Sequence, residues 1–176
     1  MSLTIELERI AEATAADAVL AAEAHPGDRV YVCAFADGAA RTWLAFDQNA
    51  EPIADRRRLR DAVSILALCE LAEETAAGGD LDDLRSQLAA LRVTENPTGI
   101  EEAEEAVLVL QRALGAPPTL ATPARLDEIG AATRSLEIAL GGAAQGSPFA
   151  AAMKSAGEVV DALVTDVERS YRIPLS

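Results

Sequence analysis

The first stretch of the chain has the hydrophobic pattern of a helix. Apolar and small residues recur there at steps of three and four: Leu3, Leu7, Ile10, Thr14 and Ala18. This spacing places them on one helical face. We expect a helix that begins after Ser2 and continues to about Ala24. His25-Pro26-Gly27 should end it, because the residue before a proline is driven out of the α-helical region and a glycine permits a turn.

The pattern changes between residues 30 and 46. Two short runs, 30–35 and 42–46, are rich in β-branched and aromatic residues, and Asp37-Gly38 lies between them. An Asp-Gly pair between such runs is the strongest short-range hairpin signal. We therefore predict one β-hairpin, and Ile53 marks a possible short third strand. Because an isolated hairpin is only marginally stable, one of its faces must pack on helices.

The rest of the chain has helical patterns separated by glycine and proline. Five helices are predicted: one over residues 54–77, and others beginning after Asp80, at the capping box Thr98–Glu101, at Thr122-Pro123 and at Ser147-Pro148. The last has an apolar stripe of Phe149, Met153, Ala156, Val160, Leu163, Val167 and Tyr171. Its steps are close to those of a heptad seam.

The order of these elements predicts an α+β fold that is predominantly α. It has an N-terminal helix, one β-hairpin and about five helices in a bundle-like layer. A chain of 176 residues can bury a sizeable core without a disulfide or a metal. We therefore expect residues 1–176 to form a single domain, with a soft boundary near 115–123, where prolines gather.

Charge narrows the choice of partners. The chain has 15 Lys and Arg against 29 Asp and Glu, a formal net charge of −14. A field of that sign repels nucleic-acid phosphates and anionic lipids. Aromatic residues make up only 3% of the chain, which argues against a surface on which bases stack. We expect neither a nucleic-acid nor a membrane partner.

The start of the chain and its cysteines indicate a compartment. The first residues lack the basic start and the continuous apolar stretch of a secretory signal. No apolar run approaches the ~18 residues that a membrane-spanning helix needs. Cys33 and Cys69 lie far apart and do not have the spacing of a metal site. We expect a cytoplasmic protein with two buried, reduced thiols.

Candidate chemistry lies on the helix predicted over residues 54–77. Its middle is apolar on nearly every side, yet Glu70 falls within about 20° of Leu59 on a helical wheel, with Glu73 and Glu74 beside it. A carboxylate in apolar surroundings must be paired, neutralised or bound to a metal, because removing a lone charge from water is costly.

Three interpretations of these acids remain open. The helix can leave the core there, so that the acids lie in water. Glu70 can pair with an arginine of another helix, Arg112 or Arg134. Alternatively, Glu70 and Glu73 can bind a hard divalent cation, Mg²⁺ or Mn²⁺.

Two acidic motifs resemble those of the all-α nucleotide pyrophosphohydrolases. Residues 70–74, Glu-Leu-Ala-Glu-Glu, look like the first motif of that family, and Glu158–Asp161 looks like its second, ExxD. The resemblance implies carboxylates that hold Mg²⁺ and a nucleotide polyphosphate. However, residues 75–157 separate the motifs, far more than the short linker of the family, and Glu158 and Asp161 lie opposite the apolar stripe of their own helix. We do not assign the chain to the family.

The remaining charged groups have structural explanations. Residues 56–58 and Arg60 form a basic cluster at a helix start, where cations are unfavourable, so we expect acidic partners within the chain. His25 has no nucleophile at the spacing of a known motif, and we expect it to cap a helix C-terminus.

No catalytic motif stands out in the sequence. This favours a non-enzymatic helical interaction or regulatory protein of unknown pathway, which binds itself as a homodimer or binds another protein. The alternative is a small divalent-metal-dependent hydrolase that acts on a phosphate ester or nucleotide through the carboxylates of the 54–77 helix.

Overall fold

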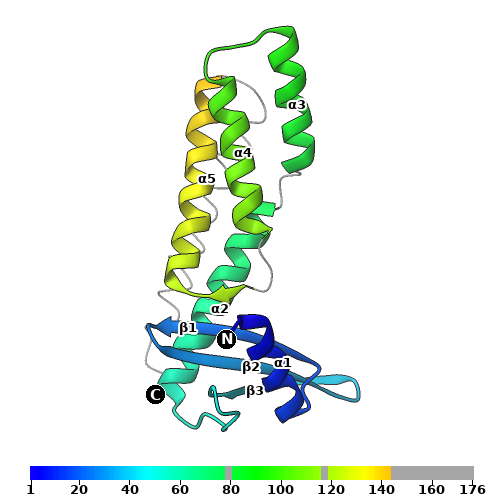
Figure 1. Cartoon of the computed structure of the whole chain (residues 1–176), viewed down its shortest axis with the longest axis vertical. Coiled ribbons are helices and arrows are strands. Elements are labelled where there is room, and N and C mark those ends of the chain that lie inside the picture. The colour runs from blue at the N-terminus through cyan, green and yellow to red at the C-terminus, as the bar shows by residue number, and fades with distance from the viewer. Residues whose placement is uncertain (78–80, 116–118, 144–176) are drawn as a thin grey trace. The chain divides into compact units, whose positions relative to one another are not determined.

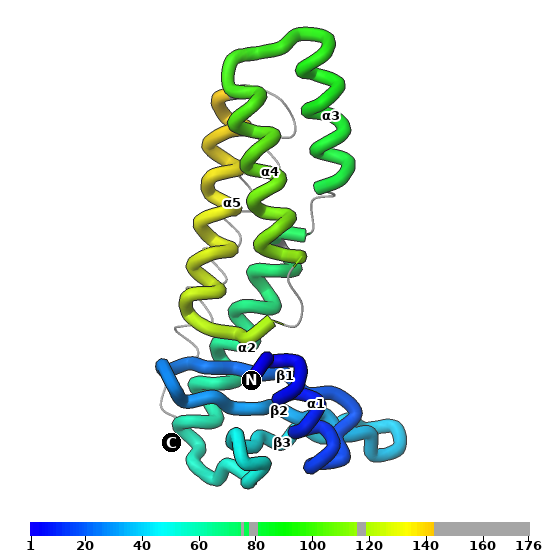
Figure 2. Tube along the Cα trace, viewed as in Figure 1, coloured from blue at the N-terminus to red at the C-terminus, as the bar shows by residue number. Residues whose placement is uncertain are grey.

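The computed structural model describes residues 1–77, 81–115 and 119–143 (Figures 1 and 2). In these ranges the chain forms five α-helices and one four-stranded sheet. The fold is therefore mixed and mostly helical, as expected, but its sheet has four strands where one hairpin was predicted. None of the helices in these ranges is long and apolar enough to cross a membrane.

The elements divide between two units, one of residues 1–69 and 117–125 and one of residues 70–116 and 126–176. Their order is α1 (Leu3–Thr14), β1 (Ala18–His25), β2 (Asp28–Asp37), β3 (Ala40–Phe46), α2 (Arg56–Ala77), α3 (Leu81–Thr94), α4 (Ile100–Leu114), β4 (Leu120–Ala121) and α5 (Pro123–Ala143). Helices α2 and α5 each contribute residues to both units.

The first unit is built on the sheet, in the order β3-β2-β1-β4. The predicted hairpin is confirmed as β2 and β3, which pair Asp37 with Ala40 around a two-residue turn. Gly38 in that turn has a φ of 60°, a conformation that favours glycine. The possible third strand near Ile53 is reduced to a single bridge between Phe46 and Pro52.

The predicted first helix is wrong beyond Thr14. Helix α1 ends there because Ala15 takes up a left-handed conformation with a φ of 53°. Residues 18–25 form β1 instead, which pairs antiparallel with β2 and parallel with the two-residue β4. Alanine and leucine favour helix, but pairing with two neighbouring strands overrides this weak local preference.

Strand β2 is buried on both of its faces over residues 30–34. Alternate residues of a strand point to opposite faces. Tyr31 and Cys33 pack with Ile10 of α1, while Val30 and Val32 lie buried on the other face. Figure 1 shows α1 in front of the sheet.

The second unit has an alanine-rich core. Its helices bury thirteen side chains together: Ala72, Ala76, Leu84, Leu88, Ile100, Ala103, Ala106, Val107, Leu110, Ile129, Ala132, Leu136 and Leu140. Alanine contributes little apolar area per residue, so the large side chains of this core supply most of the hydrophobic stabilisation.

Most predicted helix starts are confirmed, with one exception. The hydroxyl of Thr122 accepts a hydrogen bond of 2.9 Å from the Arg125 backbone N–H, as expected for the cap of α5. The capping box over Thr98–Glu101 is not formed, because Gly99, with a φ of 89°, occupies the N-cap position of α4 without a side-chain hydrogen bond. The predicted helix after Ser147 lies outside the described residues.

Replacing Leu136 by alanine tests this core. Leu136 is fully buried, so the variant should lose about 2–5 kcal/mol of unfolding free energy through lost contacts and a residual cavity. Urea unfolding followed by circular dichroism measures the loss. The control is Val93→Ala on α3, because Val93 is 87% exposed and its truncation should cost within about 0.5 kcal/mol. Equal losses in the two variants would contradict the assignment of the core.

Candidate functional site

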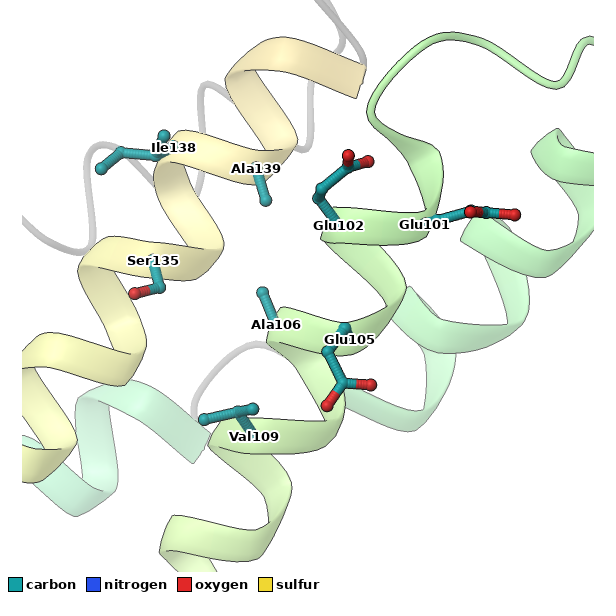
Figure 3. Close-up of a pocket in the computed structure, with 8 residues that line it drawn as sticks. All are labelled: Glu101, Glu102, Glu105, Ala106, Val109, Ser135, Ile138 and Ala139. Carbon is teal, nitrogen blue, oxygen red and sulfur yellow. The ribbon is translucent and has the colours of Figure 1, made fainter.

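Helices α4 and α5 leave a groove on the surface of the second unit (Figure 3). Its volume is about 680 Å³. The small side chains of Ala106, Ser135 and Ala139 lie along it, and Figure 3 shows Ala106 and Ala139 on neighbouring turns of the two helices. Small residues let another backbone approach closely, so this floor can accept a helix.

Two large apolar side chains border the groove. Ile138 of α5 is 77% exposed and Val109 of α4 is 42% exposed. The core side of the same two helices is occupied by Leu136 and Leu110. Ile138 and Val109 lie outside that core. The groove thus has exposed apolar side chains at its border on both helices.

The rim of the groove is acidic. Glu101, Glu102 and Glu105 line it from α4. Glu101 accepts a hydrogen bond of 2.9 Å from Arg92, and Glu105 lies 4.0 Å from Arg112. No ion pair involves Glu102 within the part of the chain that the structure describes. The rim therefore presents negative charge to anything that approaches the groove.

The acids predicted on α2 lie at or near its surface. Glu70 and Glu74 are exposed, and Glu73 is half-buried. The buried face of this helix passes instead through Ala62, Ile65, Cys69, Ala72 and Ala76. The exposure of Glu70 agrees with the interpretation in which the helix leaves the core.

The predicted partners of Glu70 were Arg112 and Arg134. Among the described residues no ion pair joins Glu70 to Arg112 or Arg134, and Arg112 faces Glu105. Those residues also include no group of three or more His, Cys, Asp or Glu side chains that could hold a metal ion. A metal site at Glu70 and Glu73 stays a prediction, while Glu158 and Asp161 lie outside the described residues.

The first unit contains a polar network that the sequence did not predict. The hydroxyl of the fully buried Tyr31 donates a hydrogen bond of 2.7 Å to Glu6, and Arg29 pairs with the same carboxylate. Arg29 Nε also lies 3.5 Å from Glu23. These groups border a cavity of about 230 Å³. No spacing rule links Glu6 with Tyr31, because only the packing of α1 on the sheet brings them together.

The network shifts the ionisation of its members. The hydrogen bond from Tyr31 holds the pKa of Glu6 below its usual value, with Arg29 acting in the same direction. Burial raises the pKa of Tyr31. The polar groups bond to one another, so the arrangement stabilises the contact of α1 with the sheet.

The turn between β1 and β2 is tied to α2. His25 Nε2 lies 3.2 Å from Asp61, and Arg58 lies 2.6 Å from Asp28. His25 therefore ends a strand, and the expectation that it caps a helix is wrong. The pair of Arg58 with Asp28 confirms the expected acidic partner within the chain for this part of the basic cluster.

Comparisons with known proteins give no relative. No protein-family model, no curated protein and no solved structure matches the chain.

The Glu6 network predicts a pH-dependent contribution to stability. A carboxyl whose pKa is lowered on folding stabilises the fold above its ordinary pKa of about 4.3, and this contribution disappears as the pH falls through the lowered value. At pH 7, Glu6→Gln should lower the melting temperature by about 2–4 °C, the effect of losing about 1 kcal/mol. Thermal denaturation between pH 3 and 7 should show this difference shrink in acid.

Glu8→Gln is the matched control, because Glu8 lies exposed on the same helix. It should leave the melting temperature unchanged at pH 7. A deficit of Glu6→Gln that stays constant down to pH 3 would argue against the network as its cause.

Proposed function

We propose that this chain is a non-enzymatic interaction or regulatory protein that associates with a second copy of itself through the face formed by α4 and α5. The observation that carries the proposal is the exposure of two large apolar side chains, Ile138 at 77% and Val109 at 42%, at the border of a groove lined by small residues. Full burial of an isoleucine stabilises by about 1.5–3 kcal/mol, so covering this face is favourable.

The geometry favours a symmetric contact. Most homodimers pair one surface patch with itself about a two-fold axis. In such a pair Ile138 can pack on the small-residue floor of the partner, and Val109 can do the same on the other side. The acidic rim limits the affinity, because the like charges of Glu102 and Glu105 face each other across the axis.

The rest of the chain fits this role. The net charge of −14 disfavours nucleic-acid and anionic membrane surfaces as partners. Cys33 and Cys69 are buried and form no disulfide, which suits the reducing cytoplasm. A protein partner of the α4–α5 face is consistent with both features.

Ile138→Glu should weaken self-association. The variant puts a charge at the centre of the apolar border, and we expect its dimer dissociation constant to rise at least about tenfold, which corresponds to about 1.4 kcal/mol. Sedimentation equilibrium of the full chain measures the constant. Val93→Glu is the control, since Val93 is exposed on α3 outside the groove. A strict monomer at high concentration, or equal effects of the two variants, would contradict the proposal.

A divalent-ion titration separates this proposal from the hydrolase alternative. We expect millimolar Mg²⁺ or Mn²⁺ to leave the melting temperature unchanged in the wild type and in Glu70→Gln alike, because Glu70 is exposed and two carboxylates alone bind weakly. Thermal-shift measurements decide this. A rise in the melting temperature of the wild type that Glu70→Gln abolishes would instead favour a metal-dependent hydrolase.

A further inference from the structure

Strand β3 lies at one margin of the sheet, and its residues 40–44 are exposed (Figure 1). Among the described residues, strand pairing on the outer side of β3 is limited to its end, where Phe46 forms a bridge with Pro52. A strand edge that is open in this way can pair with another extended chain. We propose that residues 40–44 bind, as a fifth strand of the sheet, an extended apolar peptide segment of another protein that carries one acidic residue opposite Arg41. This inference does not depend on the α4–α5 face.

The backbone of β3 turns hydrogen-bonding groups outward at Arg41 and Trp43. In an antiparallel pair, one residue bonds to the neighbouring strand and the next turns its N–H and C=O to the other side. The two-residue turn makes Ala40 a residue that bonds to β2, so Arg41 and Trp43 face outward. The alternation is confirmed at Ala45, whose carbonyl accepts a hydrogen bond of 2.9 Å from the Ile53 N–H on the outer side. Arg41 and Trp43 can therefore each exchange a pair of backbone hydrogen bonds with a peptide strand.

Two large apolar side chains flank this backbone, one on each face of the sheet. Trp43 is 49% exposed and Leu44 is 52% exposed, and consecutive residues of a strand point to opposite faces. On β2 the neighbours of Trp43 and Leu44 are the smaller residues Ala34 and Cys33. A fifth strand would place a side chain beside Trp43 on one face and beside Leu44 on the other, and would remove apolar surface of both from water.

Arg41 specifies the charge of the peptide. It is the only charged residue of β3, and it forms no ion pair with the residues that the structure describes. An acidic residue directly opposite it would form a favourable cross-strand pair of opposite charges. The net charge of −14 disfavours a peptide with several acids. The edge therefore fits an apolar segment with a single acid.

A second copy of β3 fits this edge poorly. Symmetric antiparallel pairing about Thr42 or Trp43 would place Ala39 or Arg41 of the second copy opposite Ala45, where residue 53 already lies. Symmetric pairing about Arg41 would instead set two arginines directly opposite each other, which is unfavourable. A separate extended segment has no hairpin turn and can end before residue 53. It is therefore the occupant that this edge favours.

The fluorescence of Trp43 tests the proposal in the full chain, because Trp43 is its only tryptophan. The probe is the acetylated and amidated peptide Val-Ile-Thr-Glu-Thr, which in the antiparallel direction sets its Ile opposite Trp43 and its Glu opposite Arg41. Titration into the millimolar range should shift the emission to shorter wavelength and reach saturation, since the strand covers the indole. Absence of a saturating shift would overturn the proposal.

Two N-methylated peptides are the matched controls. Methylation of the Ile and Glu amides removes the N–H groups that face β3 and should weaken binding at least about tenfold. Methylation of the Thr amide between them alters a group that points away from β3 and should change the dissociation constant by no more than about twofold. Equal effects of the two modifications would exclude strand pairing and overturn the proposal.

A charge reversal tests the position of the acid. Arg41→Glu should weaken binding of the probe at least about threefold, and a probe with Lys in place of Glu should restore it, since the pair is then reversed in sign. Failure to restore binding would overturn the placement of the acid opposite Arg41. A shift of the Trp43 emission that grows with protein concentration without peptide, and persists in Ile138→Glu, would show that the edge binds a second copy and would also overturn the proposal.

Discussion

The second unit depends on burying a few large apolar side chains in a core that is rich in alanine. Alanine contributes little apolar surface, so the core relies on side chains such as Leu110, Leu136 and Leu140. On the same helices, Ile138 and Val109 lie outside this core and are exposed at the border of the groove. The function proposed for the groove depends on this division of each helix into a buried and an exposed face.

Charged residues are distributed differently in the two units. The chain has few cations, and several of them are engaged in the first unit, where Arg29 pairs with Glu6 and Arg58 pairs with Asp28. These pairs connect α1 and α2 to the strands. In the second unit, Glu101, Glu102 and Glu105 form the rim of the groove. A surface of this charge repels polyanions.

Strong local signals in the sequence predicted their elements, and weak ones failed. Asp37-Gly38 located the hairpin, and Thr122-Pro123 located the start of α5. Strand β1 was missed because its alanines and leucine continue a helical spacing, and β4 is too short to leave a pattern. On α2 the face that contains Leu59 was predicted to be buried, whereas the buried face includes Ala62, Ala72 and Ala76. Glu70 lies close to Leu59 around the helix and was therefore predicted to have apolar surroundings. The groove could not be predicted at all, because it depends on which side of α5 remains uncovered.

Strand β4 makes the sheet of the first unit depend on residues that come much later in the chain than its other strands. It pairs Ala21 with Leu120, so two residues made long after the rest of the sheet complete its edge. During synthesis the edge of β1 stays open until residue 121 has left the ribosome, while all of α3 and α4 is already available to fold. An unpaired strand edge can pair with other chains. Nascent chains arrested within α4 should therefore be the form of this protein most prone to aggregate, although every one of them already contains β1, β2 and β3.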